Sequence, residues 1–480
     1  MKNNRHDVSV STLAKNPKVQ VASRWLVRPA ILMFFVVCMP QVIFSQQTPT
    51  NSPLTLRQAV SIALEKNPQR KVALADTKAA AANVQEARSF LLPHLTFSET
   101  GTRGNDPVYV FGSKLRQQRF TTADFGLNLL NTPTPFNNFS TRFGATWNLF
   151  DSFASWRGVA RAEREKEAAA HQLDRADQEV VFEVVNSFYG LLLAKKELEV
   201  AQQAMKTAQA VFDRSKTRVE SGVAVESDFL NAQVRFAARK QELIRAQNNL
   251  SLATAELGRA MGISTDSAFE PVESLAERTL PTTPLEELEK QAMETRPDLK
   301  RIRSEEAAQQ QSVAIAKSSF GPRVNAFADW EADNPTFASG GGGHNWMAGF
   351  EVQLDLFRGG AKRAELQRQR ALAEKVAALK EAAKDAIRLE VQRAYYDLDA
   401  ARQQVNVAKA AIAQAQESLR ITQNRYESGV STITDLLTAE EEASRTQADY
   451  WQTVYRYQTG YANLELAAGT LNAQSPVVMP

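Results

Sequence analysis

The stretch "RYESGVSTITDLLTAE" at positions 425–440 has a near copy, "RVESGVAVESDFLNAQ", at positions 218–233. The two copies lie 207 residues apart, and each follows a run of residues that favours uninterrupted helix. A glycine, Gly222 or Gly429, stands at the only break in each copy. Glycine at the end of a long helix is typical of a left-handed residue that caps it. The repeated motif therefore predicts two long helical hairpins within one chain.

The similarity between the two motifs extends through most of the chain. The segments "ALEKNPQRK" at 63–71 and "AMETRPDLK" at 292–300 match at an offset of 229 residues, and later segments match at 207. The first copy therefore carries 22 more residues after Pro93, which suggests a longer surface loop. A whole-chain repeat indicates one supersecondary unit used twice. We predict a first structural repeat over 46–262, a linker over 263–284, a second repeat over 285–469 and a C-terminal tail over 470–480.

Each repeat is expected to contain a helix, a β-hairpin and then long helices. The predicted β-hairpins cover 94–150 and 323–357, and the predicted long helices cover 155–262 and 361–469. The second long run has neither glycine nor proline over 68 residues, from Ala361 to Ser428, which is about 100 Å of helix.

The long helices carry a regular stripe of apolar and small residues. Its positions in the second copy alternate at spacings of three and four: Val391, Ala394, Leu398, Ala401, Val405, Ala408, Ile412, Ala415, Leu419, Thr422 and Tyr426. The first copy repeats this stripe between Val184 and Val219. Such a heptad pattern predicts helices that supercoil around their neighbours.

The predicted strands alternate between apolar and polar residues. One face of each main strand is largely apolar: Phe139, Thr141, Phe143, Ala145, Trp147 and Leu149 in the first copy, and Trp346, Ala348, Phe350, Val352, Leu354 and Leu356 in the second. Strands of about ten residues with this alternation are typical of transmembrane β-barrels. Because open strand edges are not tolerated in lipid, four strands per chain must be completed by other copies. Two copies give eight strands, too few for a channel, whereas three give twelve and leave a lumen.

The sequence therefore predicts an α+β membrane protein. Duplicated helix–β-hairpin–helix repeats would form a trimeric twelve-stranded β-barrel, continued by a long α-helical barrel. Its shape is that of a duct.

Residues 1–45 predict an export signal. Arg24 and Arg28 precede the apolar run "AILMFFVVCMPQVIF", which is shorter than the roughly 20 residues that span a bilayer. Cys38 is the only cysteine and lies within this run, so cleavage would leave a mature chain without a disulfide.

Two roles are open for the aspartates that follow the glycines. Ser227 and Thr434 are predicted to cap the returning helices, with Asp228 and Asp435 in the first turn, where the helix dipole favours a carboxylate. In a ring of hairpins, three copies of Asp435 would also form an acidic constriction that binds cations. Tyr426, one turn before Gly429, is placed to hydrogen-bond across to a neighbouring tip.

The duplicated layout, "YESGVSTITDLL", "ALEKNP" and the terminal "LELAAG" resemble the TolC family of outer membrane efflux proteins over about 54–469. The resemblance implies a homotrimer in the outer membrane lipid of a Gram-negative-type bacterium, with a periplasmic helical extension whose tip is closed at rest. It also implies two partners, an inner-membrane transporter and a periplasmic adaptor (membrane fusion) protein that docks at the tip.

Motif by motif, the resemblance assigns roles to residues of the two tips. Asp435 matches the family's aspartate ring, and Tyr426, Ser227 and Asp228 match the links that hold the tip shut. The pairs Gly222-Val223 and Gly429-Val430 match the adaptor-docking turns. Ser431 and Thr438 depart from the pattern, because some members have a basic and an acidic residue there.

Other function classes find little support. The chain has 57 basic and 54 acidic residues and no basic block, which argues against nucleic-acid binding. The four histidines are scattered, and no metal-ligand cluster, phosphate loop or nucleophile elbow occurs, so we expect no enzyme activity, cofactor or metal. The main alternative is a periplasmic coiled-coil adaptor or scaffold that does not span the membrane. Within the duct interpretation, drug or metal efflux and protein secretion remain open.

Overall fold

The computed structural model describes residues 52–267, 269–278, 280–281, 283–337 and 342–479. The predicted export signal lies outside these residues. The helices, in chain order, are α1 (Leu56–Lys66), α2 (Pro68–Ser89), α3 (Pro107–Arg116), the 3₁₀ turn η1 (Thr122–Phe125), α4 (Leu127–Asn131), α5 (Ala154–Glu220), α6 (Glu226–Met261), α7 (Leu285–Thr295), α8 (Pro297–Ser318), α9 (Ala361–Glu427) and α10 (Ile433–Ala468). The strands are β1 (Ser52–Leu54), β2 (His94–Gly104), β3 (Phe136–Phe150), β4 (Phe269–Pro271), β5 (Arg323–Asn334) and β6 (Gly343–Gln353).

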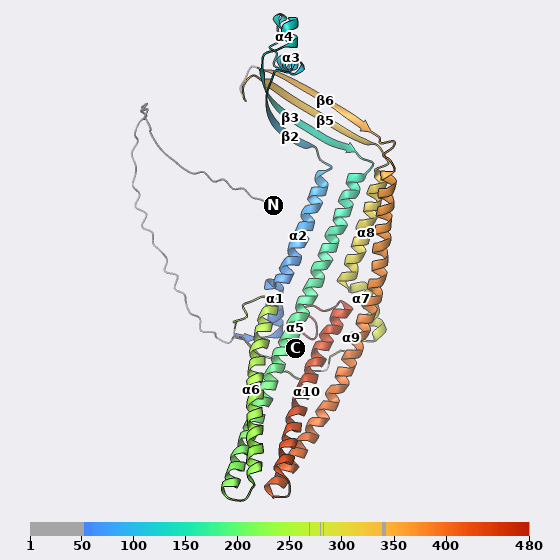
Figure 1. The fold of residues 1–480 in the computed structure, drawn as a ribbon. Helices are drawn as coiled ribbons and strands as arrows, with labels where there is room; N and C mark the ends of the chain where they lie inside the picture. The colour runs from blue at the N-terminus through green and yellow to red at the C-terminus, as the bar shows by residue number, and fades with distance from the viewer. Residues whose placement is uncertain (1–51, 268, 279, 282, 338–341, 480) are drawn as a thin grey trace, which may run out of the picture. The chain divides into compact units, whose positions relative to one another are not determined.

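The main helices of the two halves have equal lengths. α1 and α7 have 11 residues each, α2 and α8 have 22, α5 and α9 have 67, and α6 and α10 have 36. In each half the long helix and the returning helix form a hairpin, and α2 or α8 lies beside the other end of the long helix (Figure 1). The β-strands β2, β3, β5 and β6 lie at that same end (Figure 1).

The long helices are continuous because their residues favour helix throughout. α9 is rich in alanine, leucine, glutamate and lysine, which are strong helix formers, and its 67 residues span about 100 Å. The heptad stripe predicted on α9 is confirmed, since every position of the stripe from Val391 to Tyr426 is buried or half-buried. This stripe faces α10, so each long helix buries one seam against its returning partner.

The largest apolar core lies around the middle of α5. Val180, Val184 and Phe188 are almost fully buried there, among residues of α1, α6 and α10. The segment after α10 closes this core, because Leu471 and Val478 are also fully buried. Part of the linker between the halves runs beside α1, where β4 pairs with β1 in parallel. The sequence does not predict this pairing, because strands of three residues carry no periodic signal.

Two buried joints tie the last helix of each half to its own first helices. In the first half, the Asn67 side-chain amide donates a 2.9 Å hydrogen bond to the carbonyl oxygen of Ala260. In the second half, the Arg296 guanidinium donates to the carbonyl oxygen of Ala467 at 3.1 Å. The same guanidinium forms ion pairs with Asp298 and Glu390, at 2.6 and 2.7 Å.

The four longer strands form one antiparallel sheet in the order β2-β3-β5-β6. The second β-hairpin is predicted to end at residue 357, but β6 stops at Gln353. Leu354 and Leu356 therefore lie beyond the sheet. β2 and β6 are the edges of this sheet within the chain, and their outer backbone groups have no strand partner among the described residues.

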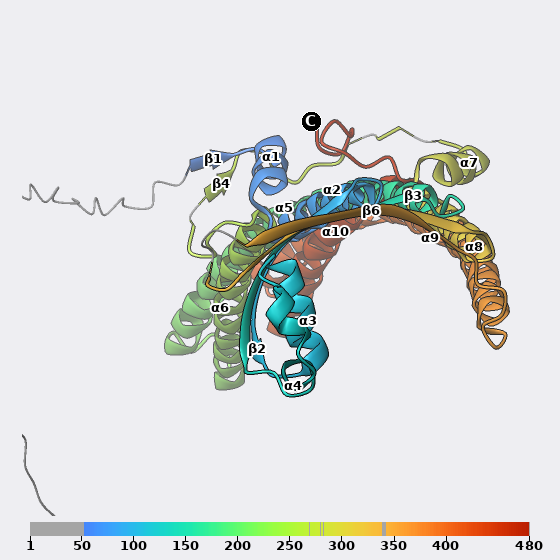
Figure 2. The same ribbon diagram turned by 90° about the horizontal axis from the view of Figure 1, so that it is seen from above.

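The longer connection in the first half is not a plain loop. Between β2 and β3 it contains α3, η1 and α4. Figure 2 shows α3 and α4 within the curve of the sheet, on its concave side.

The carboxyl group of Glu465 on α10 gives the helical part a pH dependence. Burial raises the pKa of Glu465 to about 7, although a hydrogen bond with the Ser475 side chain lowers this pKa by a smaller amount. The folded state therefore keeps a proton that the unfolded chain releases near pH 4.5, and stability falls as the pH rises from 4.5 to 7. We expect Glu465→Gln to stabilise the protein at pH 8 by on the order of 1–2 kcal/mol, after discounting for partial solvent exposure, and to change little at pH 4.

Thermal unfolding of the purified protein at pH 4, 6 and 8 would measure this difference. Glu442→Gln is the matched control, because Glu442 is exposed on the same helix. A benefit of Glu465→Gln that is equal at all three pH values would contradict the proposed cause.

Candidate functional site

The turns of both helical hairpins are built around a glycine in the left-handed region. Gly222 and Gly429 have φ values of 71° and 74°, as the sequence predicts. After each helix the chain turns back so that the next amide bonds the last helical turn: Val223 N–H donates to Arg218 O at 2.8 Å, and Val430 N–H donates to Arg425 O at 2.9 Å. The two valines remain solvent-exposed, at 67% and 68%.

Asp435 caps its own helix through Thr432, which is not the partner predicted from the sequence. The predicted cap Thr434 is wrong, because Thr432 is the N-cap of α10 and its hydroxyl accepts from Asp435 N–H at 3.2 Å. In return, the Asp435 carboxylate accepts from the backbone N–H and the hydroxyl of Thr432, at 3.0 and 2.8 Å, and from the Ser431 hydroxyl at 3.0 Å. These hydrogen bonds lower the pKa of Asp435, and the bond from the Thr432 hydroxyl has the largest effect. The Asp435 carboxylate therefore stays charged.

The first tip lacks this capping box. Val225 is the N-cap of α6 and provides no side-chain bond, so the predicted cap Ser227 is also wrong. Asp228 does lie in the first turn, where the helix dipole favours its charge. The two aspartates therefore occupy equivalent positions in the repeat, but only Asp435 takes part in a capping box.

Tyr426 contacts the other tip through its ring. The Arg218 guanidinium lies 5.3 Å from the centre of the Tyr426 ring, in a cation–π arrangement. Within the described residues the Tyr426 hydroxyl forms no hydrogen bond, so the bond across to a neighbouring tip in a ring of hairpins stays a prediction. A second contact between the tips is the ion pair of Arg214 with Glu427, at 3.2 Å.

A small apolar cluster joins the two hairpins just behind the tips. It consists of Val211, Ala232, Ile433 and Leu436, all buried. Arg235 lies beside it and donates to Leu437 O at 3.2 Å, and it also pairs with Glu441. These arginines and this cluster are not among the residues predicted from the sequence. Arg218 carried a signal, since Arg425 stands at the equivalent position of the second copy.

The other part of the site is the sheet, whose two faces differ sharply. Residues paired across all four strands form an aromatic row, Phe97–Phe143–Trp330–Trp346, on one face. The next row on that face is Ala145–Ala328–Ala348. Most of these apolar side chains are exposed. An exposed apolar face of this size marks a surface that another phase or molecule covers.

The opposite, concave face is polar. It carries Ser98, Thr100, Asn138, Ser140 and Arg142, together with Asp329 and Glu331. A sheet whose convex face is apolar and whose concave face is polar has the pattern of the wall of a β-barrel channel. No helix of the described residues combines the length and the apolar character that crossing a membrane requires.

Comparisons with known proteins agree with this geometry. The model of the family described as "Outer membrane efflux protein" matches residues 59–263 and 288–470. The alkaline protease secretion protein AprF of Pseudomonas aeruginosa is 24% identical over 87% of this chain and 85% of its own. The outer membrane protein TolC of Escherichia coli K12 is 22% identical over 87% of this chain and 83% of its own.

Among solved structures, the CmeC outer membrane channel of Campylobacter jejuni aligns with a TM-score of 0.74. It is 16% identical and covers 90% of this chain and 92% of its own. That likeness concerns the fold. The match of the family model over most of the chain decides the family: the chain belongs to the outer membrane efflux proteins, the TolC-like family of outer membrane channels.

Proposed function

We propose that this chain is the outer membrane exit duct of a tripartite efflux or type I secretion system. Three copies would join their sheets edge to edge, β6 of one chain to β2 of the next, into a twelve-stranded barrel. The helices would continue the duct through the periplasm. The observation that carries the proposal is the sheet itself, with an exposed apolar face, a polar concave face and two unpaired edges.

The helical tips would form the inner end of this duct. Asp435 from three copies would form a ring of negative charge, supported by Asp228 and closed by the contacts of Tyr426. The polar Ser227 would line the same constriction. The proposal rests on the position of these residues at the hairpin turns and on the charge of the Asp435 carboxylate.

The exposed turns are the proposed docking points for a periplasmic adaptor. Gly222-Val223 and Gly429-Val430 present a bare apolar side chain beside a glycine in each turn. The adaptor would link the duct to an inner-membrane transporter. The domain limits proposed for this chain remain an export signal over 1–45, repeats over 46–262 and 285–469, the linker over 263–284 and the tail over 470–480.

Conductance in planar lipid bilayers tests both the duct and its acidic ring. We expect detergent-purified protein to insert and give a small, cation-selective conductance. Asp435→Asn should reduce the cation selectivity several-fold, because a ring of fixed charges sets which ions enter a pore. Asparagine keeps an oxygen that can accept the Thr432 N–H, so this change removes the charge and spares much of the cap.

Asp449→Asn, on the same helix but away from the tip, is the control and should leave selectivity unchanged. If Asp435→Asn inserts and its cation selectivity equals that of the parent, the duct proposal is supported, but Asp435 acts only as a helix cap. A protein that is soluble without detergent and never inserts would contradict the duct.

A further inference from the structure

The connection between β2 and β3 is long because it folds back into the sheet. It covers residues 105–135, whereas β5 and β6 are joined by residues 335–342 alone. Seven sheet residues line the space under α3: Ser98, Thr100, Thr102, Asn138, Ser140, Arg142 and Glu331. All of them belong to the polar, concave face, so α3 covers the face that would line the lumen.

The C-terminal end of α3 is fixed by a buried polar network. The Gln117 side chain is fully buried, and its Nε2 donates to Asn137 O, Asn138 Oδ1 and Asn334 O at 2.8, 2.7 and 3.2 Å. Asn138 Nδ2 in turn donates to Asp333 Oδ1 at 2.6 Å. Gln117 Oε1 and Asp333 Oδ2 accept no hydrogen bond among the described residues, so the bonds donated by Gln117 Nε2, whose two N–H groups are shared among three acceptors, hold this end of α3.

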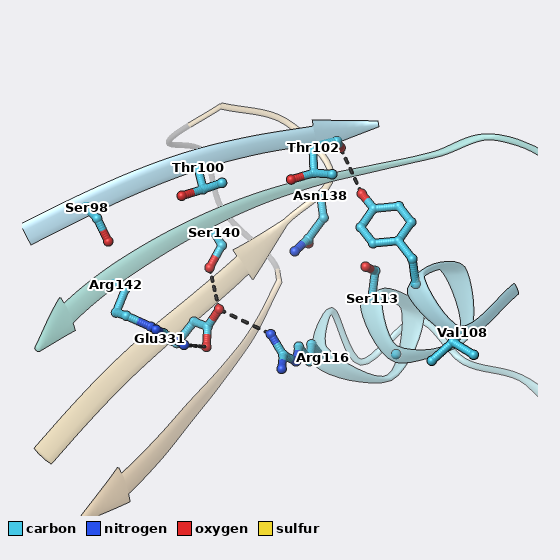
Figure 3. A pocket seen from close by; sticks show the side chains of 12 residues that line it. Ser98, Thr100, Thr102, Val108, Ser113, Arg116, Asn138, Ser140, Arg142 and Glu331 are labelled. Carbon is cyan, nitrogen blue, oxygen red and sulfur yellow. Dashed lines mark hydrogen bonds and ion pairs between the residues drawn. The ribbon is translucent and has the colours of Figure 1, made fainter. Parts of the chain in front are cut away.

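Two further contacts hold α3 along its length (Figure 3). The Arg116 guanidinium forms an ion pair with Glu331 at 3.3 Å, and Glu331 also binds Arg142 at 3.2 Å. At the other end of the helix, the Tyr109 hydroxyl donates to Thr102 O at 2.8 Å. α3 is therefore attached to β2, β3 and β5 together.

The start of β6 leaves no room between itself and α3. A Cβ placed on Gly343 would lie 2.0 Å from the carbonyl oxygen of Arg116. Only glycine permits this approach of two backbones. Between α3 and the rest of the sheet a polar space of about 500 Å³ remains, so the insert narrows the concavity without filling it.

We propose that the 105–135 insert is an outer constriction of the duct, separate from the closed tips. The inference rests on the proposed trimeric barrel, in which three copies of α3 would enter one lumen at its outer mouth. A helix with its side chains is about 10–12 Å wide, so three of them restrict the opening to small solutes. The constriction sets the size of molecule that can enter the barrel from outside the cell, whatever the state of the tips.

A cysteine placed deeper in the lumen tests this constriction. Thr146 is exposed on the polar face, eight residues along β3 from Asn138, or about 26 Å at the rise of a strand. Intact cells with Thr146→Cys would be treated from outside with a small membrane-impermeant maleimide, or with a maleimide on a long polyethylene glycol chain. The chain without the reporter gives the baseline, because Cys38 is its only cysteine.

We expect the small reagent to react equally with the parent and with a variant whose residues 105–135 are replaced by residues 335–342. The polymer reagent should react on the order of tenfold more slowly with the parent, because pore diameter limits its access. Gly343→Ala should accelerate the polymer reaction in the same direction. Gly112→Ala, on α3 with nothing within 4 Å of the added Cβ, should not.

Equal polymer rates in the parent, the replacement and Gly343→Ala would overturn the constriction. So would a Thr146→Cys that the small reagent cannot reach after the insert is replaced. If the variant with the replaced insert fails to assemble, the polymer reaction rates of Gly343→Ala and Gly112→Ala test the constriction by themselves. Ala348→Cys, on the apolar face, separates the two proposals: fast reaction there with the small reagent would contradict the barrel itself.

Discussion

Ala348→Arg is expected to prevent assembly of the protein in the outer membrane. Ala348 lies in the alanine row of the apolar face, directly beside the aromatic row that ends at Trp346. In the proposed barrel this row faces the hydrocarbon interior. An arginine near the middle of the bilayer costs about 2–4 kcal/mol, so three copies in a trimer cost about 6–12 kcal/mol. That cost is comparable to the whole stability of an ordinary domain.

Met347→Arg is the matched control for this prediction. Met347 precedes Ala348 on the same strand, and its side chain points to the opposite, polar face. There the arginine would be solvated in the lumen, and assembly should proceed. The measurement is the amount of trimer in outer membrane fractions, seen on gels of unheated samples. Normal trimer with Ala348→Arg, or equal loss with both variants, would contradict the proposed orientation of the sheet.

Long periodic segments were the most predictable part of this fold. The stripe on α9 runs for ten turns, so single exceptions do not hide it, and its positions are buried as predicted. The alternation on β3 and β6 likewise separates two faces over several residues. Periodicity does not mark where a strand ends, since β6 stops at Gln353 although the apolar alternation continues to Leu356.

At both tips the helix begins after a different residue from the one predicted, Val225 and Thr432 in place of Ser227 and Thr434. Thr432 is the last residue before α10 and Thr434 is its second residue, and only the spacing of Thr432 to Asp435 fits a reciprocal capping box. That signal was present in the sequence and was missed. The repeat marks Arg218 as a position of interest, since Arg425 is its equivalent, but nothing local predicts its contact with Tyr426, because the two residues are 208 positions apart on two different hairpins.

The insert was predicted as a surface loop for a physical reason. Its helices are short, and helices of ten residues or fewer are unstable alone in water. α3 is stable because Gln117 and Arg116 bind strands that are more than 20 residues away in sequence. A long-range packing effect of this kind cannot be predicted from local propensity.

Gly469→Ala is expected to destabilise the helical part far more than Gly429→Ala, although both glycines have the same φ of 74°. A Cβ on Gly429 would have nothing within 4 Å, so alanine there meets only the cost of the left-handed conformation, about 1–2 kcal/mol. A Cβ on Gly469 would lie 2.8 Å from Cα of Arg296. The two backbones must therefore separate at this buried joint.

Separation at this joint also breaks the bond from Arg296 to Ala467 O, and leaves a buried guanidinium without one of its partners. Overpacking of about 1–3 kcal/mol and an unsatisfied buried group of about 1–3 kcal/mol add to the conformational cost, giving roughly 3–8 kcal/mol in total. The equivalent joint in the first half predicts the same contrast, because a Cβ on Gly262 would lie 2.7 Å from Cα of Asn67 and one on Gly222 would meet nothing.

Thermal unfolding of the four single variants tests this contrast between turn and joint. Gly262→Ala and Gly469→Ala should unfold at much lower temperature than the parent, or fail to accumulate, while Gly222→Ala and Gly429→Ala should shift the transition only slightly. Four equal shifts would mean that the left-handed conformation alone sets the cost, and that the close approach at the joints contributes nothing. The turn and the joint stand at opposite ends of the same 36-residue helix in each half, so the contrast compares a tolerant end of the hairpin with a closely packed one.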